Sequence, residues 1–255
     1  MSAHVIDTAT PGLITLLAIS LVIAGLLKGV IGVGMPVVAF PMLSMLVDVP
    51  TAVMLLSMPL ILSNIPQALE GGRVGPTLWS LLPVLAGLVP GTWIGVAALL
   101  NLDPAVAKTA AGAGVILVAA LTLFAPKLRI QQRMTGPVGL VAGLCGGLLG
   151  GIAAISGPLV FIFLLAKGLT GKAFTKEASM FLVVSSVLLA SALTASQRFD
   201  GRDVLISTLA TAPVVAGMLA GQRLRDAVPA DAFRTLVVAV VLLSGAQLVW
   251  EGVSG

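Results

Sequence analysis

Ten apolar segments follow one another along the chain, and most of them are long enough to cross a lipid bilayer. They lie at about 12–31, 36–47, 50–69, 78–100 and 104–125, then at 137–152, 157–167, 174–197, 204–220 and 232–250. A spanning helix needs about 20 apolar residues, and lipid admits only elements that pair their own backbone groups. Only 9% of the residues are charged, whereas a soluble domain carries roughly 25%. The sequence therefore predicts an all-α polytopic membrane protein.

The second and seventh segments are too short to span, and each follows a stretch rich in Gly and Pro. The first stretch, residues 25–41, reads GLLKGVIGVGMPVVAFP; the second, residues 143–161, reads GLCGGLLGGIAAISGPLVF. Gly and Pro loosen or break a helix, and the freed backbone groups survive in a membrane only where protein or water satisfies them. Broken segments at matched places in two halves point to a binding site.

The two halves repeat one pattern. At an offset of 118 residues, Gly25, Gly29 and Gly32 match Gly143, Gly147 and Gly150, and at an offset of 130, Pro83, Gly87 and Gly91 match Pro213, Gly217 and Gly221. We interpret this as a duplication in which each unit is a broken helical hairpin followed by three spanning helices. The second half has gained residues, first in the loop before Pro158. The predicted units are a first membrane repeat at 1–126, a cytoplasmic linker at 127–136 and a second membrane repeat at 137–255.

Charge predicts the orientation. If the chain turns back at every segment, 11 of the 14 Lys and Arg residues fall on one side and 3 on the other. If the short segments do not return the chain, the count is about 8 against 6. The first arrangement follows the positive-inside rule. It predicts a bacterial inner (plasma) membrane protein with both termini periplasmic, and five segments per half make the repeats inverted. The formal charge of +4 is then a topology signal, and no nucleic acid partner is expected.

The first break holds a lone cation, Lys28. It is either an anion contact, helped by helix N-termini at Pro36 and Pro158, or a lysine that snorkels to the cytoplasmic interface. On the third segment, Asn64 and Gln67 lie three residues apart and share a helical face.

The third segment also holds Ser57 and Ser63, and its counterpart, the eighth, holds Ser179, Ser185, Ser186 and Ser191. Such neutral groups either hold an oxyanion by hydrogen bonds or join helices to one another.

Several kinds of chemistry have no residues to carry them. Cys145 and His4 are the one cysteine and the one histidine, so we expect no metal site, no cofactor and no enzymatic activity. The acidic residues sit in loops or at segment ends, and none lies in mid-span as a proton relay or sodium ligand. An exporter of anions can instead be driven by the membrane potential. Proton coupling through Glu70 or Glu177 is the weaker alternative.

The duplicated signature resembles that of the TauE/SafE sulfite exporter family. It pairs GLLKGVIGVGMPVVAFPML with GLLGGIAAISGPLVFIFLLAKGL, and the resemblance covers nearly the whole chain. It implies a secondary permease for sulfite, sulfoacetate or other organosulfonates. The matching positions are Lys28, Gly29, Gly32, Gly34, Pro36, Gly147, Gly150, Gly157 and Pro158. The chain departs from the family in two ways. The residues IAAIS stand between Gly151 and Gly157, where the family has a fuller glycine cluster, and the chain has ten apolar segments where the family usually has about eight spans.

The candidate substrate-binding set combines these positions with the neutral polar residues. It comprises Lys28, Gly29, Gly32, Gly34, Pro36, Asn64, Gln67, Gly147, Gly150, Ser156, Gly157, Pro158, Ser185 and Ser186. The rival functions are a passive channel for small anions or neutral sulfur compounds and a membrane scaffold without transport. The sequence leaves open the exact substrate, the direction, the coupling ion and the oligomeric state, a homodimer included.

Overall fold

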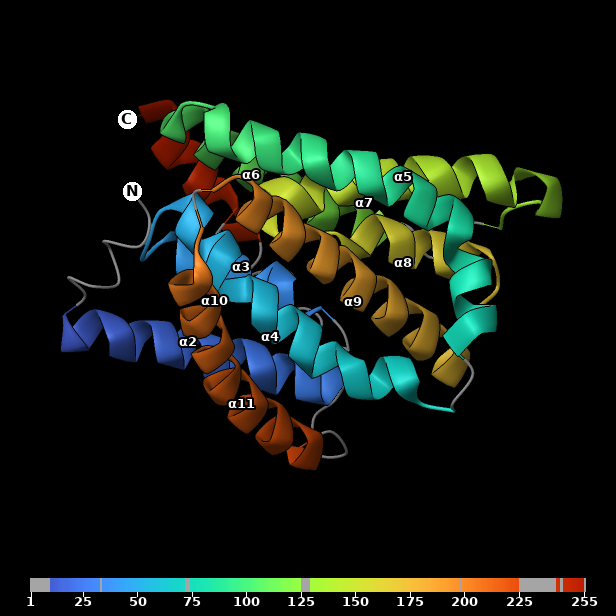
Figure 1. Ribbon diagram of the computed structural model, residues 1–255, viewed down its shortest axis with the longest axis horizontal. Helices are drawn as coiled ribbons and strands as arrows, with labels where there is room; N and C mark the ends of the chain where they lie inside the picture. Colours follow the sequence, from blue (N-terminus) through green and yellow to red (C-terminus); the bar gives the residue numbers. More distant parts are fainter. Residues whose placement is uncertain are drawn as a thin grey trace.

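The computed structural model describes residues 10–32, 34–71, 74–124, 129–197, 199–224, 242–243 and 245–254, and its regular structure in these ranges is entirely helical. The side chains at 31, 118–119 and 121–124 are outside this description. The helices are α2 (Pro11–Ile31), α3 (Met35–Ser44), α4 (Val49–Leu69), α5 (Val74–Asn101), α6 (Pro104–Phe124), the 3₁₀ turn η1 (Gln132–Met134), α7 (Thr135–Ala153), α8 (Gly157–Ala166), α9 (Gly171–Ala195), α10 (Gly201–Leu209) and α11 (Thr211–Leu224) (Figure 1).

The prediction of an all-α polytopic membrane protein is confirmed. Within the described ranges, six stretches are long and apolar enough to cross a membrane, and α3 and α8, at ten residues each, are not. The predicted segment 204–220 is two helices, α10 and α11, divided at Ala210. Most of the predicted segment 232–250 falls outside the described residues, as do His4, Arg73, Lys127, Arg198, Arg225 and Arg234.

The two breaks have the same local geometry. Gly32, with φ 92°, caps the end of α2, and Ala154, with φ 56°, caps the end of α7. In both cases a proline stands four residues later, as the second residue of the short helix that follows. Gly32 therefore corresponds to Ala154 and not to Gly150.

The extra residues of the second half lie in a helix, so the prediction that they lengthen the loop before Pro158 is wrong. Gly29 stands three residues before the end cap of α2, whereas Gly147 stands seven residues before that of α7. Four added residues make about one helical turn. They extend α7 by roughly 6 Å while keeping its glycines on the same face.

Each half packs its first helix against the other half. α2 contacts α11 and α7 contacts α5, and Figure 1 shows α7 alongside α5. A Cβ at Gly25 would overlap the carbonyl oxygen of Val214, and a Cβ at Gly143 would overlap that of Val84.

The contacts match pairwise at the offsets of the sequence repeat. Val84 and Val214 stand 130 residues apart, as Gly25 and Gly143 stand 118 apart. Gly29 meets Met218 as Gly147 meets Leu88. The halves therefore share one packing scheme, while their inverted orientation in the membrane stays a prediction.

A proline in α4 is accommodated by a neighbouring helix. Pro59 has no N–H to donate, which leaves the carbonyl of Leu55 without its helical partner. The hydroxyl of Ser207, on α10, donates to that carbonyl at 3.2 Å and accepts from the Met58 amide at 3.0 Å. α4 and α10 are joined at this point.

We expect Gly25→Ala to destabilise the protein, because the added methyl group has no room against the α11 backbone. Overpacking of this kind costs about 1–3 kcal/mol, which lowers the melting temperature by roughly 2–12 °C for a chain of this size. The measurement is thermal unfolding of the purified protein in detergent.

The matched control is Gly75→Ala, in the first turn of α5, where a Cβ would meet nothing within 4 Å. Gly143→Ala should lower the melting temperature as much as Gly25→Ala does. Equal melting temperatures for Gly25→Ala and Gly75→Ala would contradict the packing scheme.

Candidate functional site

Lys28 lies inside the protein, three residues before the end of α2. Its side chain is 2% exposed. The ammonium nitrogen Nζ donates to Ser63 Oγ at 2.9 Å and to Asn64 Oδ1 at 2.7 Å, both on α4. These contacts contradict the interpretation of Lys28 as a lysine that snorkels to the interface.

Neighbouring polar groups fix the surroundings of this ammonium. Asn64 Nδ2 donates to the Leu60 carbonyl at 2.7 Å, which turns Oδ1 of the same amide toward Lys28. Gln67 Nε2 donates to the carbonyl of Gly32 at 3.2 Å and so satisfies a backbone group freed at the end of α2. Ser179, on α9, donates to Gln67 Oε1 at 3.1 Å. Asn64 and Gln67 thus both face the break.

The charge of Lys28 has no counterion among the described residues. Its two hydrogen-bond partners are neutral, and the ion pairs found in these ranges, Lys108 with Glu251 and Lys167 with Glu177, lie elsewhere. An ammonium has three N–H donors, and two are used here. A buried charge without a partner of opposite sign is strongly unfavourable. An anion beside Lys28 would supply both the missing charge and an acceptor for the third donor.

The second half has neutral groups at the corresponding places. At an offset of 122 residues, Ser63 matches Ser185, Asn64 matches Ser186, and Gly34 matches Ser156. Ser185 donates to Ser156 Oγ at 2.7 Å, and the three serines are buried. Lys28 itself matches Gly150 at this offset, so the second break carries hydroxyl groups and no lysine.

Both short helices begin at the breaks without a side-chain cap. Neither Gly34, before α3, nor Ser156, before α8, forms a capping bond to the helix that it precedes. Met35 and Ile155, next to these two positions, belong to one buried apolar cluster. The first amides of a helix favour negative charge, so both breaks add positive potential to the interior.

The glycines of the predicted set have different structural roles. Gly29 and Gly147 face the backbones of α11 and α5, so helix packing accounts for them. Gly32 and Gly34 have φ of 92° and 94°, a conformation that favours glycine. A Cβ at Gly34 would meet nothing within 4 Å, so there is space at this break.

Three further predicted positions shape the second break. Gly150 lies against Ser156, and Gly157 against the Phe161 ring. Pro158 is the second residue of α8, as Pro36 is of α3.

Two residues near the site were absent from the predicted set. Ser63 contacts Lys28 directly, and Ser179 holds Gln67. The signal for Ser63 was its match to Ser185 at an offset of 122, which also relates Ser57 to Ser179.

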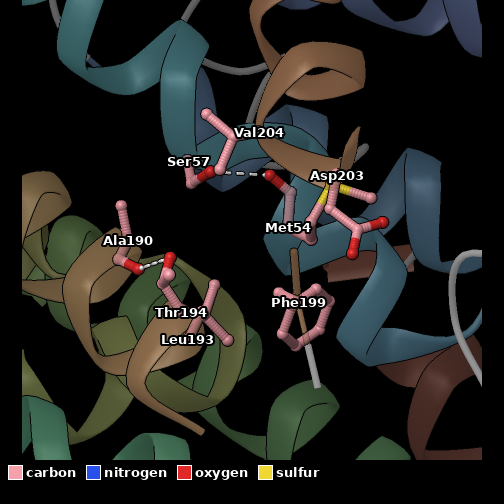
Figure 2. Close-up of a pocket in the computed structure, with 8 residues that line it drawn as sticks. All are labelled: Met54, Ser57, Ala190, Leu193, Thr194, Phe199, Asp203 and Val204. Carbon is pink, nitrogen blue, oxygen red and sulfur yellow. Dashed lines mark hydrogen bonds between the residues drawn. The ribbon is translucent and has the colours of Figure 1, made fainter. Parts of the chain in front are cut away.

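A separate small cavity lies between α4, α9 and α10 (Figure 2). Met54, Ser57, Ala190, Leu193, Thr194, Phe199, Asp203 and Val204 line a space of about 10 Å³, which holds about one water molecule. Asp203 is 2% exposed; its Oδ2 accepts from the Asp200 amide at 3.0 Å, and its Oδ1 has no hydrogen-bond partner. This cavity is too small for an organic anion and is not lined by Lys28.

Comparison with known proteins identifies one family. The family model described as Sulfite exporter TauE/SafE matches residues 17–248. No curated protein and no solved structure matches the chain.

We expect Asn64→Ala to destabilise the protein in a way that depends on Lys28. Removing the amide takes one of two acceptors from a buried ammonium, which costs about 1–3 kcal/mol. In a Lys28→Met background the same substitution should cost less, since no charge is left to satisfy. Unfolding of the two single variants and the double variant measures the coupling. Additive losses would show that the 2.7 Å contact does not stabilise Lys28.

Proposed function

Because the chain belongs to the sulfite exporter TauE/SafE family, we propose that it is a secondary transporter of small sulfur-containing anions such as sulfite, sulfoacetate or other organosulfonates. The protein is a multi-pass membrane protein of a transporter family. The observation that carries the anion assignment is the buried Lys28 ammonium, held by two neutral acceptors and without a counterion among the described residues.

In this proposal the anion lies at the breaks, with Lys28 balancing its charge. The open space at Gly34 and the uncapped start of α3 receive the oxyanion group. Ser156, Ser185 and Ser186 provide hydrogen bonds from the second half. Burial of Lys28 to 2% exposure keeps its ammonium away from bulk solvent in this conformation, so a substrate reaches Lys28 through rearranged states.

The proposed orientation places the linker in the cytoplasm and both termini in the periplasm of a bacterial inner membrane, with inverted repeats at 1–126 and 137–255. Transport is outward. The interior of a cell is negative, so the export of each negative charge is favoured by about 2.3 kcal/mol per 100 mV. No coupling ion is needed for this direction.

Lys28→Met should abolish anion binding while leaving the protein folded. A ligand that binds the native state raises its melting temperature, so the wild-type protein should be stabilised by methanesulfonate or sulfite and the variant should not. An apolar side chain of similar length can replace a buried charge without loss of stability. The measurement is the melting temperature of purified protein across an anion series.

The matched control is Lys172→Met, which removes an equal charge from an exposed position in the first turn of α9. It should keep the full anion-dependent shift. A shift that survives in Lys28→Met would remove Lys28 from the site.

Potential alone should drive accumulation of labelled methanesulfonate in proteoliposomes. At 100 mV, positive inside, one carried charge supports a concentration ratio of roughly 50-fold. We expect this plateau without any proton or sodium gradient, together with saturable initial rates. A plateau that moves with an imposed proton gradient would indicate proton coupling, and rates that never saturate would indicate a channel.

A further inference from the structure

The interior charge of the protein limits the charge of its substrate. Nine of the 14 Lys and Arg residues are described by the structure, and Lys28 is the buried one among them. A single ammonium balances a single negative charge. We propose that the site selects singly charged oxyanions, such as hydrogensulfite or a simple sulfonate, over doubly charged anions of the same shape. This inference rests on the function proposed above and narrows its substrate class.

The second half has no room for another cation at the corresponding place. In the register of the helix-packing glycines, Lys28 corresponds to Gly146, and in the register of the helix ends it corresponds to Gly150. A Cβ at Gly146 would lie 2.8 Å from the carbonyl oxygen of Ser156, and a Cβ at Gly150 would lie 2.9 Å from the Ser156 Cβ. In either register the α8 entry loop occupies the space that a lysine side chain needs.

The other buried polar residues at the breaks are neutral. They are Ser63 and Asn64 in the first half and Ser156, Ser185 and Ser186 in the second. Such groups donate or accept hydrogen bonds to the oxygens of an anion, but they do not neutralise a second charge.

The other buried charged residue in the described ranges is acidic. Asp203 is 2% exposed, and its Oδ1 has no hydrogen-bond partner. It lies beside Ser57 of α4, the helix that also carries Ser63 and Asn64. Among the described buried residues, no second cation therefore accompanies Lys28.

The experiment compares two pairs of anions on the wild-type protein, so it does not depend on the folding of a variant. Methanesulfonate and sulfate share a tetrahedral sulfur and differ by one charge. Isethionate and sulfoacetate share a two-carbon sulfonate and differ by a hydroxyl group against a carboxylate. Apparent dissociation constants come from melting temperature against anion concentration at constant ionic strength.

We expect each monoanion to bind roughly 100-fold or more tightly than its doubly charged partner, because a second buried charge has no partner to offset its desolvation. Lys28→Arg, which keeps the charge, should keep this ratio. Equal binding within both pairs, or tighter binding of sulfate and sulfoacetate, would overturn the charge rule while leaving an anion site in place. Absence of binding by all four anions would overturn the proposed function itself.

Discussion

A helix that stops inside a membrane must have its free backbone groups satisfied by the protein, and the rest of this structure follows from that constraint. α2 stops at Gly32, and the carbonyl of Gly32 accepts from Gln67 of α4. Such a bond forms only if α4 lies close to the end of α2. The close approach of α2 to α11, through glycines without side chains, brings the first half against the second. The glycines let the helices pack closely, and this packing lets a neighbouring helix satisfy the backbone groups that are free at the break.

The scaffold is symmetric and the site is not. Gly25 and Gly143 make equivalent contacts, and both short helices start with a proline at the second position. Lys28 nevertheless has no counterpart in the second half, where the extra turn of α7 brings Gly146 and Gly150 against Ser156. A duplicated chain can therefore keep its architecture through the glycine contacts while one copy of the site gains a charge.

The sequence predicted those features that depend on spacing along one helix. The lengths of the apolar segments predicted the helices, and the three-residue interval between Asn64 and Gln67 correctly predicted that they share a helical face. The depth of Lys28 depends on what packs around it, and a cation three residues from the end of an apolar run is compatible with both burial and snorkelling. The contact to Ser63 decided between them. The sequence predicted the extra residues in the loop before Pro158, because Gly150 matches Gly32 at an offset of 118. The left-handed residue that caps α7 is instead Ala154, so the extra residues form a turn of the helix.

The hydrogen bonds of the site also indicate which parts move together during transport. Lys28 and Gly32 of α2 are bonded to α4, and α4 is bonded to α10 through Ser207. On the other side of the site, α5 and α7 are joined by their own glycine contacts. α9 packs along α4 and also contacts α5, and its Ser179 donates a neutral hydrogen bond to Gln67 of α4. An opening that separates Gln67 from Ser179 leaves the partners of the ammonium in place, whereas an opening between α2 and α4 strips them from a buried charge. Breaking the second set of contacts leaves a buried charge without acceptors, which is costly, so we expect α2 and α4 to stay together in any rearrangement of the protein.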